Sequence, residues 1–226
     1  MLLTAPAAAA QTVDEIIAKN LAAKGGVEKL KGTTTVRMTG TATVQGTAVP
    51  VLTVTKRPNL MRNEMEMAGQ KIVQAFDGTT VWMVVPGAPP QEVPAGPQTD
   101  MLKRRSQFDP IFLDYKEHGH KIELKGTETE DGKEVHHLVV TPKEGPVVHY
   151  YIDKATGLEA KMVTEITDPA MKGQLETRLT DYREVDGRMI PFSMTQSIDG
   201  KTIAEMKFEK VEFNVPIDDT LFKMPK

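Results

Sequence analysis

Hydrophobic and polar residues alternate with a period of two along most of the chain, which predicts antiparallel β-strands rather than helices. The stretch 49–85 shows the pattern most clearly. One predicted strand ends at Arg57-Pro58, because proline cannot donate to a β-ladder. The next two strands cover 60–67 and 70–76, and a fourth runs through Trp82. Short turns that contain glycine separate these strands, as tight hairpins require.

The same alternation continues on both sides of this stretch and predicts about 11 or 12 strands in all. The first strand of this stretch covers 47–57, and outside the stretch we expect strands over 33–44, 121–130, 134–141, 147–153, 158–168, 174–185, 189–198 and 201–214. So many long neighbouring strands should curl toward a barrel. The predicted fold is mainly β with a few helices: a half-open antiparallel β-barrel of one domain, 12–226, whose width leaves an apolar cavity to be filled.

Helical spacing appears in only a few short segments. Thr12 and Glu15 form a capping box before an amphipathic helix that ends at Gly25-Gly26. A Pro/Gly-rich loop over 86–97 has no periodicity, and it precedes two short helical pieces, 101–105 and 111–115. Two interpretations of this insertion remain open: a movable lid over the barrel, or a static plug of its end.

The strand 60–67 places Met61, Asn63, Met65 and Met67 on one face and its charged residues on the other. Methionine is flexible and polarizable, so a face built from it adapts to ligands of variable shape. The alternative is an ordinary core that happens to use methionine.

Composition excludes several classes of protein and site. The 226 residues carry a net charge of −3 without a basic block, so we expect no nucleic acid as partner. No apolar run is long enough to span a bilayer. The chain has no cysteine, which excludes disulfides and thiolate chemistry. Residues 1–11 are similar to the end of a secretory signal peptide, and a disordered alanine-rich tail is the alternative.

No motif for catalysis is present. The five histidines lack the spacing of a metal site, and there is no nucleophile elbow, phosphate loop or dinucleotide pattern. We therefore expect no enzyme activity, no cofactor and no metal. Arg57 is the one charged residue of interest. Its guanidinium, at the rim of the sheet, can hold carbonyl oxygens of a neighbouring segment, or it can simply be solvated.

Several segments resemble the LolA family of periplasmic lipoprotein carriers. Lys56-Arg57-Pro58-Asn59-Leu60, followed after a hairpin by Asp77-Gly78-Thr79-Thr80-Val81-Trp82, is similar to the family hallmark. The strand and turn over 150–158 and the closing segment 215–225 resemble those of the wider superfamily. The sequence departs from true carriers in its early end after Phe222, in the long loop 86–97, and in Asn63, where the family has an aromatic residue.

The resemblance implies a half-open barrel whose apolar cavity takes acyl chains under a lid formed by 101–115. It implies that Arg57 holds this lid closed through hydrogen bonds to the lid backbone. The lipid-binding residues that we expect on this basis are Met38, Met61, Asn63, Met65, Trp82, Met101, Leu102, Phe108 and Phe112.

The leading functional hypothesis is a monomeric periplasmic carrier that takes acyl chains of lipoproteins or other lipids toward the outer membrane. Its expected partners are an inner-membrane ABC transporter and an outer-membrane acceptor. The alternative is a non-enzymatic periplasmic module of the same fold that senses a lipid or a peptide.

Overall fold

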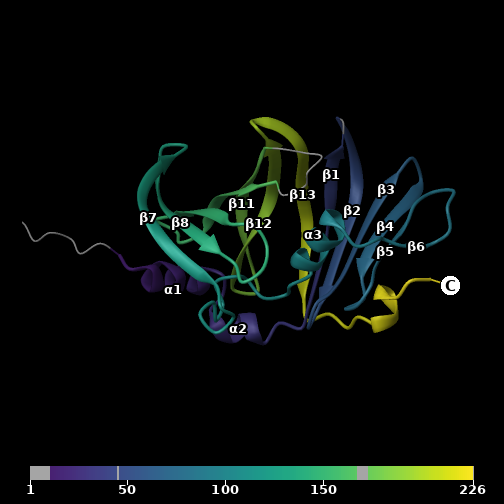
Figure 1. Cartoon of the computed structure of the whole chain (residues 1–226), viewed down its shortest axis with the longest axis horizontal. Helices are drawn as coiled ribbons and strands as arrows, with labels where there is room; N and C mark the ends of the chain where they lie inside the picture. The colour runs from purple at the N-terminus through teal and green to yellow at the C-terminus, as the bar shows by residue number, and fades with distance from the viewer. Residues whose placement is uncertain (1–10, 45, 167–172, 226) are drawn as a thin grey trace, which may run out of the picture.

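The computed structural model describes residues 11–44, 46–166 and 173–225. Its strands form one antiparallel sheet in the order β6-β5-β4-β3-β2-β1-β13-β12-β11-β10-β9-β8-β7. The sheet bends strongly but does not close, so β6 and β7 are its two edges (Figure 1). The predicted half-open antiparallel barrel with short helices is confirmed. Over the described residues the sheet contains 13 strands, compared with the predicted 11 or 12.

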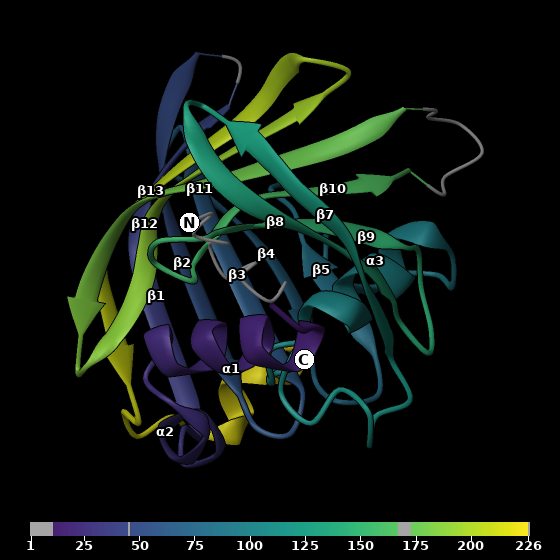
Figure 2. The same ribbon diagram turned by 90° about the vertical axis from the view of Figure 1, so that its left-hand side faces the viewer.

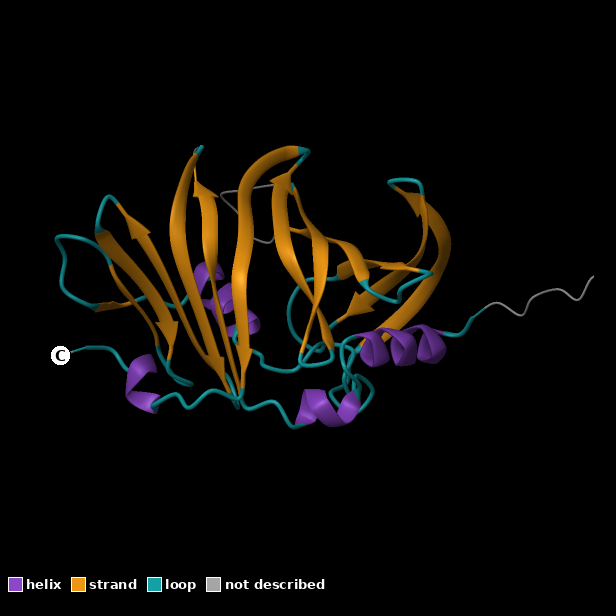
Figure 3. Cartoon of the chain, turned by 180° about the vertical axis from the view of Figure 1, so that it is seen from behind, coloured by secondary structure: helices purple, strands orange, loops and turns teal. Residues whose placement is uncertain are grey.

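The strands are β1 (Thr35–Val44), β2 (Thr47–Lys56), β3 (Leu60–Met67), β4 (Gln70–Phe76), β5 (Val81–Val84), β6 (Gln91–Glu92), β7 (Lys121–Glu130), β8 (Lys133–Thr141), β9 (Val148–Asp153), β10 (Glu159–Glu165), β11 (Gln174–Val185), β12 (Arg188–Ile198) and β13 (Lys201–Phe213). The helices of the described residues are α1 (Val13–Ala23), α2 (Val27–Lys31), α3 (Pro97–Arg105) and the 3₁₀ helix η1 (Asp219–Phe222). Figure 3 shows the few helices lying against the sheet and at its lower end.

Two predicted helical segments differ from the structure. The helix expected over 101–105 begins four residues earlier, at Pro97, because proline is well suited to the first turn, where its missing N–H costs nothing. The piece 111–115 is a series of turns rather than a helix, since Asp114 has a positive φ of 50° that breaks helical geometry. The expected signal-peptide remnant falls on residues 1–10, outside the described part, apart from Gln11, and so does the end of the strand expected over 158–168.

The cross-strand register assigns every strand residue to one of two faces. Met61 pairs with Thr55 and Phe76, and stepping from strand to strand connects this face to Leu138 of β8. We call this side the inner face, because α1 and α3 pack on it, and the opposite side the outer face.

One end of the inner face is a packed core. Ile16, Ile17 and Leu21 of α1 lie against Leu138 and Ile152 of the sheet, together with Phe112 and Leu113 from the turns after α3. Figure 2 shows α1 lying across this end of the barrel. The helix is fixed by the Lys24–Glu159 ion pair at 2.7 Å and by the side-chain amide of Asn20, which donates to the Gly157 carbonyl at 2.8 Å.

The outer face of β3–β5 is covered by the C-terminal segment 214–225. The indole N–H of Trp82 donates to the carbonyl of Phe222 at 2.7 Å, and Arg62 donates to that of Leu221 at 2.9 Å. Trp82 and Phe222 are both fully buried. Among the described residues, no helix combines the length and the apolar character needed to cross a membrane.

Candidate functional site

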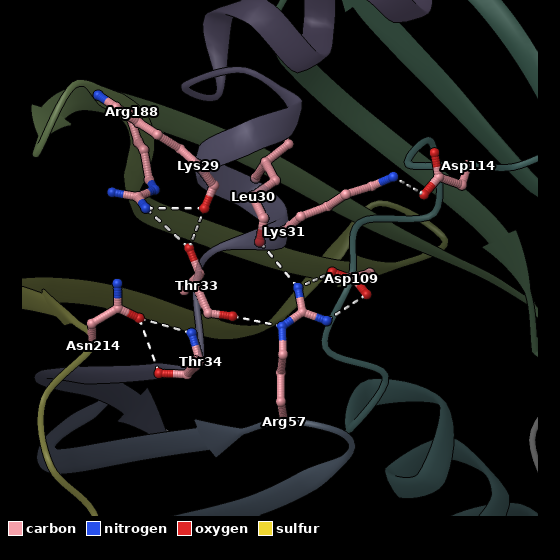
Figure 4. Close-up of polar contacts among 10 residues, drawn as sticks. All are labelled: Lys29, Leu30, Lys31, Thr33, Thr34, Arg57, Asp109, Asp114, Arg188 and Asn214. Atoms are coloured by element: carbon pink, nitrogen blue, oxygen red, sulfur yellow. Dashed lines mark hydrogen bonds and ion pairs between the residues drawn. The ribbon is translucent and has the colours of Figure 1, made fainter.

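Arg57 lies where three separate segments of the chain meet (Figure 4). Its Nε donates to the Thr33 carbonyl at 2.6 Å and its Nη2 donates to the Leu30 carbonyl at 3.0 Å. Both terminal nitrogens also donate to the Asp109 carboxylate, with Nη1–Oδ2 at 2.7 Å. The planar guanidinium suits this forked contact, which a lysine could not make. Arg57 therefore joins the end of β2 to the last turn of α2, to the loop after α2 and to the segment that follows α3.

The loop after α2 is itself held on its other side. Arg188, at the start of β12, donates to the Thr33 hydroxyl at 3.0 Å, and the Thr34 backbone N–H donates to Asn214 Oδ1 at 2.7 Å (Figure 4). Lys31 pairs with Asp114 at 2.7 Å. The carbonyls that accept from Arg57 are therefore fixed, so releasing Asp109 is the simpler way to open this contact.

The hydrogen bonds of Arg57 differ from the expected ones, which were to the backbone of the lid. The backbone carbonyls that Arg57 binds belong to Leu30 and Thr33, outside the predicted lid 101–115. The contact with the lid itself is made by a side chain, the Asp109 carboxylate. Phe108 lies next to it, with its ring centre 4.7 Å from the guanidinium carbon.

The cover of the inner face consists of two parts that pack on different halves of the sheet. On one side of Asp109, α3 inserts Leu102 against Met61, Phe76 and Val81 of β3–β5. On the other side, Phe112 and Leu113 join the core against α1 and β8–β9. Asp109 lies between these two parts, so its contact with Arg57 fixes the cover to the end of β2 at the point where the two parts meet.

Between these two packed clusters, the inner face carries a set of half-buried methionines. Each belongs to a different strand, and the register places all of them on the inner face: Met38, Met65, Met83, Met162, Met194 and Met206. Unbranched thioether side chains repack easily around shapes that vary. The middle of the inner face therefore combines a buried cluster of Phe192, Phe208 and Val211 with half-buried methionines and uncharged polar residues.

The predicted lipid-binding residues occupy several different environments. Met61 and Leu102 lie together under α3, and Asn63 and Met65 follow on the same inner face of β3. Met38 packs on the inner face against the cluster of Phe192, Phe208 and Val211. Phe112 is 1% exposed and belongs to the core against α1.

Three predicted positions do not face the middle of the inner face. Trp82 lies on the outer face, because it pairs with Ala75 while Met83 pairs with the inward Gln74. Met101 is 37% exposed on the free side of α3. Phe108 packs against Arg57 instead. We therefore leave Trp82 and Met101 out of the candidate site.

Sequence reasoning missed Asp109 and most of the methionines. Asp109 is 52 positions from Arg57, and no local pattern connects the two. The methionines of β10, β12 and β13 could have been found by extending the alternation from Met61 across the register. Predicting that register requires knowing that β1 pairs with β13.

Other surface features do not form a competing site. In the described ranges, no group of three or more histidine, aspartate or glutamate side chains is arranged to hold a metal ion. A hollow of about 390 Å³ beside Leu60 and Met224, and one of about 580 Å³ beside Thr35 and Pro216, both follow the C-terminal segment and use no inner-face residue.

Comparison with solved structures identifies the fold. A LolA superfamily protein from Nitrosomonas europaea matches 95% of this chain and 98% of its own, with a TM-score of 0.62 and 13% identity. A DUF1329 family protein from Desulfovibrio piger has a TM-score of 0.64 and 12% identity over 95% of this chain and 98% of its own. An outer-membrane lipoprotein-sorting protein domain from Vibrio parahaemolyticus has a TM-score of 0.60 and 10% identity over 92% and 94%.

Sequence comparison gives a narrower result. No curated protein matches the chain. A family model with the description "Uncharacterized protein" matches residues 113–226, half of the chain. The chain belongs to the family of this model, and its fold is that of the LolA superfamily.

Proposed function

We propose that this protein is a non-enzymatic periplasmic carrier that binds acyl chains of lipoproteins or other lipids on the middle of its inner face. The observation that carries the proposal is the set of half-buried, uncharged methionines between the clusters packed under α1 and under α3. Each methylene that leaves water contributes about 0.8 kcal/mol, so one or two chains can be retained without a polar anchor.

The contact between Arg57 and Asp109 supports the second half of the proposal, which is release. A carrier must let its ligand go, and here the joint between the two parts of the cover is held to the end of β2 by an ion pair whose side chains are 28% and 32% exposed. A partner that competes for Asp109 would separate α3 from the turns at 111–115. The inner-membrane transporter and the outer-membrane acceptor are the partners that this proposal requires.

The test is native mass spectrometry of protein purified without detergent, followed by organic extraction of bound material. We expect a co-purifying lipid or lipopeptide, and uptake of a fluorescent fatty-acyl probe by the emptied protein. Met65→Glu places a charge on the inner face and should weaken probe binding at least about tenfold, because the charge must be desolvated by the chain.

Met224→Glu is the matched control, since Met224 is 38% exposed on the C-terminal segment, away from the inner face. It should bind the probe as the wild type does. Failure of the wild type to bind any lipid or probe, or equal binding by Met65→Glu, would contradict the proposal. A bound peptide in place of a lipid would favour the sensing module instead.

A further inference from the structure

A row of uncharged polar residues crosses the inner face of β2–β4. Thr53 pairs with Asn63, and Asn63 pairs with Gln74, so the three side chains lie side by side on neighbouring strands. The row continues at its ends into Met38 and Met83. Directly paired side chains on one face have Cβ atoms about 4.5–5.5 Å apart, so a single small group can reach two of them.

Apolar residues flank this row on both sides. Val51, Met65 and Ile72 form the neighbouring row on the open side. Met61 and Phe76, under Leu102 of α3, form the row on the covered side together with Thr55. A chain lying on this surface would meet apolar contacts, then hydrogen-bonding groups, then apolar contacts again.

The three polar side chains are available for a ligand. Within the described part of the chain, none of them has a hydrogen-bond partner, although all three are half-buried. On the outer face of the same strands the polar groups are paired: Arg62 with Glu64 at 2.8 Å, and Glu64 with Lys71 at 2.8 Å. Half-buried amides without partners gain from a ligand that supplies them.

Charge further restricts what the row can bind. Every charged residue of β2–β4 lies on the outer face, as the register shows for Lys56, Arg62, Glu64, Glu66 and Lys71. No cation faces the row from these strands to balance a phosphate or carboxylate. Asn63 and Gln74 each offer a donor and an acceptor, so the best partner also has both. An amide has an N–H and a C=O, whereas an ester offers acceptors alone.

We propose that Thr53, Asn63 and Gln74 determine specificity by binding the uncharged amide of an N-acyl lipid whose chain lies on the flanking methionines. This inference rests on the proposed carrier function and names the ligand class for the same face. The row selects amide-linked acyl chains over ester-linked chains of equal length.

The experiment compares two probes that differ at one position, N-methylpalmitamide and methyl palmitate, as competitors of a fluorescent fatty-acyl probe. We expect the wild type to bind the amide about tenfold more tightly than the ester, as one or two net hydrogen bonds would give. The double variant Asn63→Leu, Gln74→Met keeps side-chain size, and it should bind both probes equally while its affinity for the ester is unchanged or higher.

Gln196→Met is the matched control. Gln196 is also a half-buried amide on the inner face, but it lies on β12, separated from β3 by β13, β1 and β2. This variant should keep the wild-type preference. The wild type alone shows whether the amide binds more tightly than the ester. The test therefore does not depend on whether the double variant folds.

The outcomes separate the two proposals. Equal binding of amide and ester by the wild type overturns the role of the row and leaves the carrier proposal intact. Binding of neither lipid overturns both. A capped apolar peptide that binds when neither lipid does would also overturn both and would assign the inner face to a polypeptide.

Discussion

Two regions of the inner face, the packed end at β8–β9 and the open end at β2–β4, follow the same alternating pattern but differ in how deeply their side chains are buried. Around β8–β9, the inward residues Leu138, Val140 and Ile152 are at most 1% exposed, because α1 and the turns at 111–115 fill the space above them. Around β2–β4, the inward residues Thr53, Asn63 and Met65 stay half-buried under a cover that reaches only Met61 and Phe76.

The difference teaches that side-chain chemistry, rather than strand pattern, separates the core from the candidate site. The packed end uses branched aliphatic and aromatic residues, which fit one arrangement closely. The open end uses methionine, threonine and side-chain amides, which can satisfy a changing partner. Both ends share one sheet, so substitutions can test each of them in the same molecule.

The largest effect should come from Phe112→Ala. Phe112 is 1% exposed and its ring centre lies 4.9 Å from that of Tyr150. Its truncation should lower the free energy of unfolding by about 3–5 kcal/mol, measured by urea denaturation. Met65→Ala, at the open end, should cost less than about 2 kcal/mol, because its side chain is already partly in water. Equal losses would erase the distinction between the two ends.

A smaller effect should follow from Arg57→Leu at the joint between the two parts of the cover. We expect a loss of about 1–3 kcal/mol, below that of a fully buried pair, and faster amide hydrogen exchange over 107–113. The measurement is exchange mass spectrometry, with Arg37→Leu as control because Arg37 is exposed on the outer face of β1. Unchanged protection of 107–113 would show that Arg57 does not hold the cover.

Trp82→Phe tests whether the tryptophan fixes the C-terminal segment 214–225 on the outer face behind the open end. The change leaves the buried Phe222 carbonyl without its 2.7 Å donor, which should cost about 1–2 kcal/mol and speed proteolysis within 214–225. Tyr115→Phe is the control, since it removes an exposed 2.8 Å hydrogen bond to Asp14 and should change little. Equal proteolysis of both variants would mean that the tryptophan does not fix the C-terminal segment.

The smallest effect should be a pH dependence at the packed end. Burial of His136 in β8, with added repulsion from Lys154 and Lys19, lowers the pKa of its imidazole. The unfolded chain, with a histidine pKa of about 6.5, then binds the proton more readily than the folded protein. Stability from this group is complete above about pH 6.5 and is lost as pH falls toward the folded pKa.

His136→Gln should therefore flatten the fall in unfolding free energy between about pH 7 and pH 5, measured by urea denaturation at several pH values. Two further contributions remain: burial and the neighbouring His137 lower the pKa of His149 on the outer face, and burial and the neighbouring His118 lower the pKa of His120. His118→Gln, at an exposed position, is the control and should retain most of the wild-type slope, because it removes only the repulsion that His118 adds to the lowered pKa of His120. A variant slope as steep as that of the wild type would exclude His136 as a source.

Most of the sheet was predictable, because alternation and glycine turns act locally. Strands β3, β4, β7 and β11 have the predicted bounds, and β6, only two residues long within the Pro/Gly loop, was missed. The side on which Trp82 lies was not predictable, since β5 is apolar at all four positions and shows no alternation. The partner of Arg57 was not predictable either, because Asp109 lies 52 positions away and no local pattern connects the two residues.

The order of strands also determines how this protein can fold. Neighbours in the described sheet are consecutive in sequence everywhere except at β1 and β13, which pair in its centre. The β1–β6 meander and the β7–β13 meander can each form from local hairpins, whereas joining them must close a loop of well over a hundred residues. During synthesis, one edge of β1 has no strand to pair with until β13 has been made. An unpaired strand edge is therefore exposed for most of chain elongation, and the charged outward residues Arg37 of β1 and Lys207 of β13 lie at the place where it later pairs.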